Sequence, residues 1–232
     1  DKAFGKLLEG EISALSKVMS EPARPLLAII GGAKISSKLT VLENMVERVD
    51  KLMIGGGMAY TFILAKGGKV GSSLVEKEMV ERAKAVLEKA ASSSTEILLP
   101  EDSICADKFA ADASFVVFNS DEIKENWMGL DIGPKSCVKF AAAVNESKTI
   151  LWNGPMGVFE FEACSKGTFT VANALKDATK NGAYTLVGGG DSVAAINACG
   201  LSDDVSYVST GGGAMLEYLE GLILPGISAI LD

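Results

Sequence analysis

The chain has 232 residues, with 22 Lys and Arg against 30 Asp and Glu, a formal net charge of −8 and no histidine. An acidic chain without a basic block disfavours nucleic acid or an anionic membrane as its main partner. The lack of histidine excludes Ser-His-Asp, Cys-His and H-E-x-x-H chemistry, and no apolar run is long enough for a transmembrane helix.

Apolar periodicity, broken by glycine and proline, predicts the elements in chain order. The first half reads as a helix over 4–20, a strand over 25–30, a helix over 36–49, a strand over 51–54, helices over 58–66 and 74–91, and a strand over 95–99. Residues 100–133 are less regular, with a strand over 114–119 and a loop over 127–130. Then follow a helix over 135–146, a strand over 149–152, a helix over 166–179, a strand over 184–187, a helix from 191, a strand over 205–208 and a helix over 214–221.

Strands that are apolar throughout and alternate with helices indicate a parallel sheet covered on both faces. The predicted fold is therefore α/β, a Rossmann-like doubly wound parallel sheet of about six strands in three α/β/α layers. Five strands end in glycine-rich turns or in Asn-Gly-Pro, namely Gly31-Gly32, Gly55–Gly57, Asn153–Pro155, Gly188–Gly190 and Gly211–Gly213. Because ligands of open parallel sheets bind at the carboxyl ends of the strands, these turns predict one rim and one site.

The turn Gly188–Ser192 shows why that site would take an anion. Asp191 and Ser192 are both good helix N-caps, and a glycine turn before a helix start leaves backbone N–H groups and the positive end of the helix dipole for a phosphate. The alternative is a capped, tight turn without a ligand. Asp191 would suit contact with Mg²⁺ on a nucleotide phosphate, or it serves only as the N-cap.

Two lysines and one acid extend the same hypothesis. Lys34 and Lys38 follow Gly31-Gly32 and are four residues apart, so on an exposed first helical turn they would share one face. They form either a solvated pair or a phosphate contact, and replacing Lys38 by Ala is expected to leave the fold intact. Glu160 is either an ordinary surface carboxylate or an acceptor for ribose hydroxyls. The turn Ser209–Gly213 adds a second nest of backbone amides.

General nucleotide signatures are missing, since neither G-x-x-x-x-G-K-[ST] nor G-x-G-x-x-G occurs. The four cysteines are far apart and include no C-x-x-C pair, which argues against a zinc site and favours reduced thiols in a cytoplasmic protein. Because the chain does not begin with Met, we expect a processed chain or a fragment.

Six motifs nevertheless resemble phosphoglycerate kinase in order and spacing. They are Gly31–Lys34, Ile54–Tyr60, Trp127–Asp131, Trp152–Glu160, Gly188–Ser192 and Ser209–Ala214. The resemblance covers essentially the whole chain and corresponds to the C-terminal, nucleotide-binding domain, with residues 1–20 as the interdomain helix region and 21–232 as the domain. That family has two Rossmann-like domains and is a glycolytic kinase, a transferase that moves a phosphoryl group between 1,3-bisphosphoglycerate and MgADP to give 3-phosphoglycerate and ATP.

The resemblance assigns roles to individual residues. Lys38, with Lys34 beside it, would contact the nucleotide phosphates and the transferring group, and Glu160 would bind the ribose. The adenine slot would be lined by Gly32, Ala33, Gly56, Gly129 and Leu130. The phosphates and the metal would be held by Asn153, Gly189, Gly190, Asp191 and Ser192, and the transferred phosphoryl would meet the amides of Gly211, Gly212 and Gly213. Ser37 departs from the family, where many relatives carry an acid, so any metal role of this position is in doubt.

The resemblance also implies a missing part. The family's basic 3-phosphoglycerate site belongs to an N-terminal domain, and the three arginines (Arg24, Arg48 and Arg82) are placed before a strand or on helices away from the glycine turns. We expect a monomer that binds ADP or ATP with Mg²⁺, binds neither nucleic acid nor membrane, and is inactive without its N-terminal domain. The alternatives are a dinucleotide-binding domain of an oxidoreductase, which the missing G-x-G-x-x-G disfavours, and a non-catalytic binding module.

Overall fold

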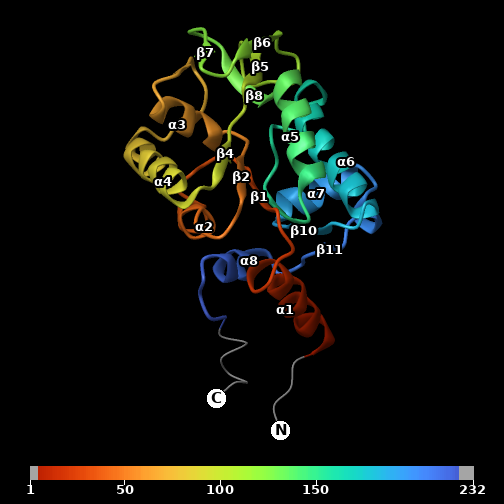
Figure 1. The fold of residues 1–232 in the computed structure, drawn as a ribbon. Coiled ribbons are helices and arrows are strands. Elements are labelled where there is room, and N and C mark those ends of the chain that lie inside the picture. The colour runs from red at the N-terminus through yellow and green to blue at the C-terminus, as the bar shows by residue number, and fades with distance from the viewer. Residues whose placement is uncertain (1–4, 225–232) are drawn as a thin grey trace.

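The computed structural model describes residues 5–224, whose helices and strands are shown in Figure 1. The α-helices are α1 (Lys6–Met19), α2 (Leu39–Met45), α3 (Met58–Ala65), α4 (Val80–Ser93), α5 (Pro134–Glu146), α6 (Lys166–Lys180), α7 (Gly190–Ala198) and α8 (Gly212–Leu219). Short 3₁₀ helices are η1 (Lys77–Met79), η2 (Glu162–Cys164) and η3 (Ser202–Asp204). Among these residues, no helix is both long and apolar enough to cross a membrane.

The main sheet has six parallel strands in the order β11-β10-β9-β1-β2-β4. They are β1 (Leu26–Ile30), β2 (Lys51–Ile54), β4 (Glu96–Leu98), β9 (Thr149–Asn153), β10 (Tyr184–Gly188) and β11 (Tyr207–Val208). All five residues of the central strand β1 are buried, as expected for a strand covered on both faces. The predicted six-stranded parallel sheet is thus confirmed.

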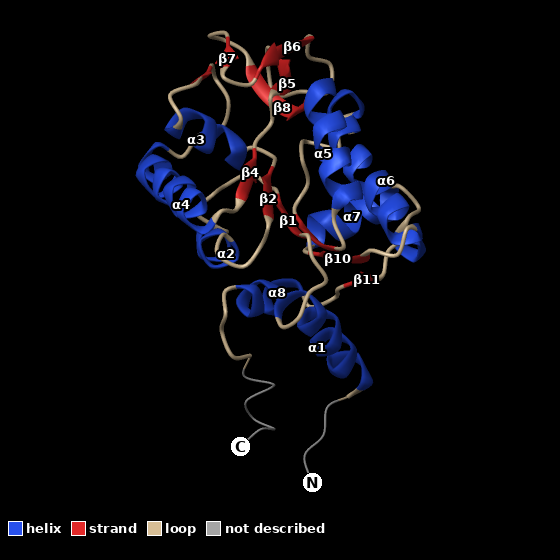
Figure 2. Ribbon diagram, viewed as in Figure 1, coloured by secondary structure: helices blue, strands red, loops and turns tan. Residues whose placement is uncertain are grey.

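Two apolar clusters cover the two faces of this sheet. Successive side chains of a strand point to opposite faces, so Ala28 and Ile30 join one cluster and Leu27 and Ile29 the other. The first cluster includes buried residues of α1, α2, α3, α4 and α8, and the second those of α5, α6 and α7. Figure 2 shows the red strands between these two groups of blue helices, which confirms the three-layer prediction.

A second, smaller sheet was not fully predicted. It is antiparallel, with the order β6-β5-β8, and consists of β5 (Asp102–Ala106), β6 (Phe115–Asn119) and β8 (Met128–Ile132), while β3 (Lys69–Val70) pairs with β7 (Glu122–Ile123). The predicted loop over 127–130 is wrong, because most of it belongs to β8, and β5 was missed. The polar residues of β5 hide the apolar pattern by which a buried strand is recognised in a sequence. In the structure, Asp102 and Ser103 are buried and hydrogen-bonded to residues of other elements.

Two predicted helices are shorter than expected. Instead of 36–49, α2 covers Leu39–Met45, and instead of 74–91, the 3₁₀ turn η1 precedes α4 at Val80–Ser93. Residues 33–38 are held by contacts to other parts of the fold rather than by a helical hydrogen-bond ladder. The helix predicted over 4–20 is α1 at Lys6–Met19; its expected start at Phe4 and the outer ends of the two expected domain ranges, 1 and 232, lie outside the described residues.

Candidate functional site at the carboxyl ends of the parallel strands

The five strands with glycine-rich or Asn-Gly-Pro ends are consecutive neighbours in the sheet: β11, β10, β9, β1 and β2. Because all five are parallel, their turns lie along one edge, which we call the rim. The chain order of the strands reverses between β1 and β9, so the turns Gly31-Gly32 and Asn153–Pro155 flank the topological switch point. The prediction of a single rim is confirmed.

Backbone packing at the switch point explains the glycines there. Gly31 N donates to Asn153 O over 2.9 Å, and Gly32 N donates to Pro155 O over 3.2 Å. Gly56 has φ 68°, and a Cβ on it would lie 2.5 Å from Gly32 O. A side chain on Gly31 or Gly56 is therefore excluded, and the exposed Ala33 beside them is also small.

Lys38 lies at this junction and not on an exposed helical turn. Its Nζ donates to Gly31 O over 2.7 Å, Asn153 O over 3.2 Å and Asn153 Oδ1 over 2.6 Å. Burial lowers the pKa of the amine to about 8, although the negative charge of Asp191 works in the opposite direction. Lys38 is the N-cap of α2, whereas Lys34 is exposed in the preceding segment. The expected shared helical face is therefore wrong.

Asn153 organises the junction from the buried end of β9. Its Oδ1 accepts from Lys38, and its Nδ2 donates to Gly188 O over 3.0 Å. The side chain is only 2% exposed. Asn153 thus ties Lys38 to the turn after β10, and both ends of its amide already have partners.

The turn after β10 leads directly into α7. Its N-cap is Gly189, with φ 90°, so neither Asp191 nor Ser192 caps the helix as the sequence suggested. Ser192 is fully buried, and its Oγ accepts a hydrogen bond from Gly154 N. Asp191 is exposed in the first turn, close enough to raise the pKa of Lys38. The first amides of α7, beginning at Gly190, therefore face the rim together with one carboxylate.

The turn after β11 is held by a residue that sequence reasoning missed. Glu11 of α1 is 7% exposed and accepts from Ser209 Oγ over 2.7 Å, from Thr210 N over 2.7 Å and from Thr210 Oγ1 over 2.9 Å. Burial alone would raise the pKa of Glu11, but these hydrogen bonds outweigh it and lower the pKa. An acid on the otherwise apolar face of the first helix was the available signal.

The hydrogen bonds around Ser209 also determine which backbone N–H groups of this turn lack a partner among the described residues. Gly211 N donates to Ser209 Oγ over 3.1 Å, and Gly211 is the N-cap of α8. Gly212 and Gly213 follow as the first helical residues, and a Cβ on either would meet open space. The helix start at Gly212 and Gly213 is thus the exposed part of this glycine turn.

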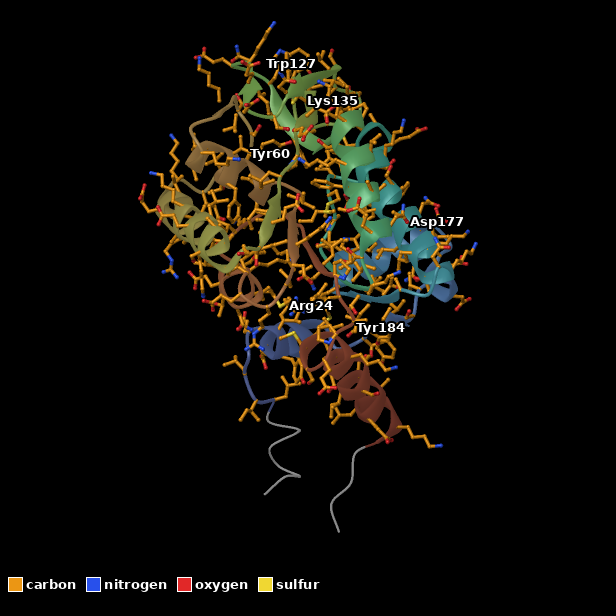
Figure 3. The ribbon with its side chains drawn as sticks, in the orientation of Figure 1. Arg24, Tyr60, Trp127, Lys135, Asp177 and Tyr184 are labelled. Atoms are coloured by element: carbon orange, nitrogen blue, oxygen red, sulfur yellow. The ribbon has the colours of Figure 1, made fainter. Side chains whose placement is uncertain are left out.

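Gly129 and Leu130 lie on β8, in the small sheet. Gly129 N donates to Ser73 Oγ over 2.9 Å, and a side chain on Gly129 would collide with the hydroxyl of Tyr60, which Figure 3 labels between α3 and the small sheet. Leu130 O accepts from Val158 N over 2.8 Å. The fold thus brings Leu130 against the segment after β9 and Gly129 against Ser73 and Tyr60, although neither residue lies on the main sheet.

Leu130 belongs to an apolar cluster with Val158 and Phe161. Phe109, which was not predicted as a site residue, is 63% exposed and packs against Phe161 with ring centroids 5.2 Å apart. Glu160 is exposed directly before Phe161. An exposed phenyl ring within a polar segment was the signal for Phe109, and it provides an aromatic surface that a planar base could contact.

Asp131 follows Leu130 and is the one described residue with a buried side-chain oxygen lacking a hydrogen-bond partner, Oδ1. Its Oδ2 accepts from Gly167 N over 2.7 Å. Burial raises the pKa of this carboxyl to about 7. Within residues 5–224, no cluster of three or more acidic, Cys or His side chains could by itself hold a metal ion.

The other charged features lie away from the rim. Arg24 pairs with Asp50 over 2.8 Å and Arg82 with Glu43 over 2.6 Å, while Arg48, in the turn after α2 rather than on a helix, bonds Asn44 over 3.2 Å. A cavity of about 1320 Å³ lies between the end of α3, the β3–β7 pair and the segment after β4. It is lined by lysines, acidic residues and apolar residues, and it includes none of the rim turns.

The family model for phosphoglycerate kinase matches residues 1–222. The chain belongs to the phosphoglycerate kinase family. It is 53% identical to the phosphoglycerate kinase of Chloroherpeton thalassium, with 99% of this chain and 58% of that protein aligned, and 51% identical to that of Porphyromonas gingivalis, with 99% and 55% aligned. The solved structure from Coxiella burnetii superposes with a TM-score of 0.94 at 45% identity, covering 98% of this chain and 58% of that one. The chain thus spans little more than half the length of these family members.

Proposed function

We propose that this chain binds MgADP and MgATP and forms the nucleotide-binding half of a phosphoglycerate kinase. The observation that carries the proposal is the rim, where Lys38 and the starts of α7 and α8 lie at the ends of neighbouring parallel strands. Helix N-termini and a lysine are suitable groups for binding phosphates. The complete enzyme would transfer a phosphoryl group between 1,3-bisphosphoglycerate and ADP in glycolysis.

The base would bind on the apolar side of the rim. Gly32, Ala33 and Gly56 offer a surface without bulky side chains, and Leu130 with Gly129 would form the opposite side. The exposed ring of Phe109 supports this placement, because an aromatic side chain can stack on a planar base. Glu160, exposed next to this cluster, would accept hydrogen bonds from the ribose.

The phosphates would bind where the positive groups converge. Lys38 and Lys34 would contact them from the β1 side, and the amides of Gly189, Gly190 and Asp191 from the β10 side. The free helix start at Gly212-Gly213 would meet the phosphoryl group in transfer, whereas Gly211, Asn153 and Ser192 would act by holding the turns in place. Catalysis of this kind depends on positioning and on neutralising charge on the phosphoryl oxygens.

Magnesium fits this arrangement as part of the nucleotide substrate. Mg²⁺ is commonly bound by one or two carboxylates together with phosphate oxygens and water, and Asp191 is an exposed carboxylate at the start of α7. The ion would neutralise charge on the phosphates. Ser37, whose Oγ donates to Lys34 O over 2.8 Å, offers no acid for this purpose.

The remaining proposals concern the rest of the enzyme. Residues 1–20 would be the interdomain helix region and 21–232 the nucleotide-binding domain, acting as a monomer. The phosphoglycerate site would belong to an N-terminal domain, because the arginines of this chain have partners away from the rim. On that basis the chain alone would bind nucleotide without turning it over.

A calorimetric titration tests the proposal. We expect MgADP to bind with one site per chain and NADH to bind at least tenfold more weakly, because the G-x-G-x-x-G fingerprint of dinucleotide domains is missing. Tighter binding of NADH would favour the oxidoreductase alternative. Mixing the chain with an N-terminal domain from a relative should then restore phosphoryl transfer, and binding without restored transfer would favour a non-catalytic module.

A further inference from the structure

The segment 71–76 connects β3 to η1 without regular secondary structure and touches both sides of the candidate site. Ser73 Oγ accepts from Gly129 N over 2.9 Å, on the side proposed for the base. At the other end of the segment, Glu76 contacts Ser36, on the side that carries the lysines. We call residues 71–76 the strap.

The Glu76 carboxylate holds Ser36 at two points. Oε2 accepts from Ser36 N over 3.0 Å, and Oε1 accepts from Ser36 Oγ. Glu76 is itself anchored, because its N–H donates to Thr61 Oγ1 over 3.2 Å and Thr61 is buried in α3. Burial would raise the pKa of Glu76, but the hydrogen bonds from Ser36 and the charge of Lys34 lower it, so the carboxylate is charged at neutral pH.

Ser36 lies midway between the two lysines. The segment 33–38 precedes α2 and lacks a helical hydrogen-bond ladder. Lys38 is fixed by its own three hydrogen bonds at the junction, and Ile35 is fully buried. Ser36, two residues after Lys34, is held from outside the segment by the side chain of Glu76, whose charge also acts on Lys34. We therefore expect the Glu76 contact to influence the direction of the Lys34 side chain.

We propose that Glu76 is a positioning residue that holds the segment 33–38 so that Lys34 faces the nucleotide phosphates beside the independently fixed Lys38. The part of this inference that concerns the nucleotide rests on the proposed function. A carboxylate fixed by a buried helix is suited to this task, because two acceptors on one rigid group set both the position and the orientation of a peptide N–H and a hydroxyl. The residue does not touch the nucleotide.

Binding measurements separate positioning from general destabilisation. Glu76→Ala should weaken MgADP binding about 10-fold, at the lower end for hydrogen bonds to a charged group because Ser36 is exposed, and should leave adenosine binding unchanged. Glu76→Gln should recover most of the affinity, since its amide can accept from Ser36 N and donate to Ser36 Oγ. The matched control is Glu78→Ala, an exposed acid two residues away that has no side-chain partner among the described residues.

A second measurement needs no nucleotide. In Glu76→Ala, hydrogen exchange of the free chain should become faster in residues 33–38 and stay unchanged in β1. In the control Glu78→Ala, exchange in residues 33–38 should match that of the wild type. Unchanged exchange in that segment, or an equal loss of ADP and adenosine affinity, would overturn the positioning role. If the wild type fails to bind ADP while hydrogen exchange responds as expected, the role of Glu76 in holding residues 33–38 is supported and the proposed nucleotide function is refuted.

Discussion

Replacing Lys38 by Ala should destabilise the protein even without a ligand. The substitution leaves three acceptors without their donor: Gly31 O, Asn153 O and Asn153 Oδ1. Hydrogen bonds to a charged group contribute about 1.5–3 kcal/mol each, whereas the burial that brings the pKa to about 8 costs the charged amine about 3 kcal/mol. With the lower value for all three bonds, the difference is a net loss of about 1.5 kcal/mol, or about 3–6 °C in melting temperature for a chain of this size.

Thermal and urea unfolding of the free chain measure this loss. Lys34→Ala is the control, because Lys34 is exposed and its removal should change the free energy of unfolding by less than about 0.5 kcal/mol. A Lys38→Ala protein as stable as the wild type would refute the reasoning. It would mean that the cost of burying the amine equals or exceeds the contribution of its three hydrogen bonds.

Three further predictions follow from the pKa shifts. Because the pKa of Lys38 is about 8, MgADP affinity in calorimetric titrations should fall as the pH rises through about 8, when the amine loses its charge, and a flat profile up to pH 10 would contradict this. The pKa of Glu11 is lowered in the folded state, so its charged carboxylate stabilises the fold above the ordinary pKa, and this contribution is lost as the pH falls. In urea unfolding, Glu11→Gln should lower the free energy of unfolding by about 1–3 kcal/mol at pH 7 and by much less near pH 3. The pKa of Asp131 is raised from 3.8 to about 7, so the folded state binds more protons and stability falls as the pH rises between these values; Asp131→Asn should remove that slope.

The rim could be predicted from the sequence because two strong local signals coincide there. A fully apolar strand such as Leu26–Ile30 has few alternatives to the middle of a parallel sheet, and the glycines after it mark the turn. Since parallel strands align their ends, five such turns identify one edge without any knowledge of the strand order.

Contacts between distant segments could not be predicted in this way. The strand β5 is stabilised by tertiary hydrogen bonds, in which Ser136 N and Ser136 Oγ donate to Asp102 Oδ1, and such pairs leave no periodic signal. The spacing of Lys34 and Lys38 suggested a helical face, but the bonds of Lys38 to Asn153, 115 residues away, hold it in the junction instead. Glu11 reaches residues 198 and 199 positions further along the chain for the same reason.

The central claim is that MgADP binds at the rim. Backbone amide chemical shifts of the chain, recorded with increasing MgADP, test it most directly. We predict saturable shifts concentrated at the turns after β1, β2, β9, β10 and β11, including Gly32, Gly190 and Gly212. Shifts confined to the cavity between α3 and the β3–β7 pair, around Lys69 and Lys124, would contradict it.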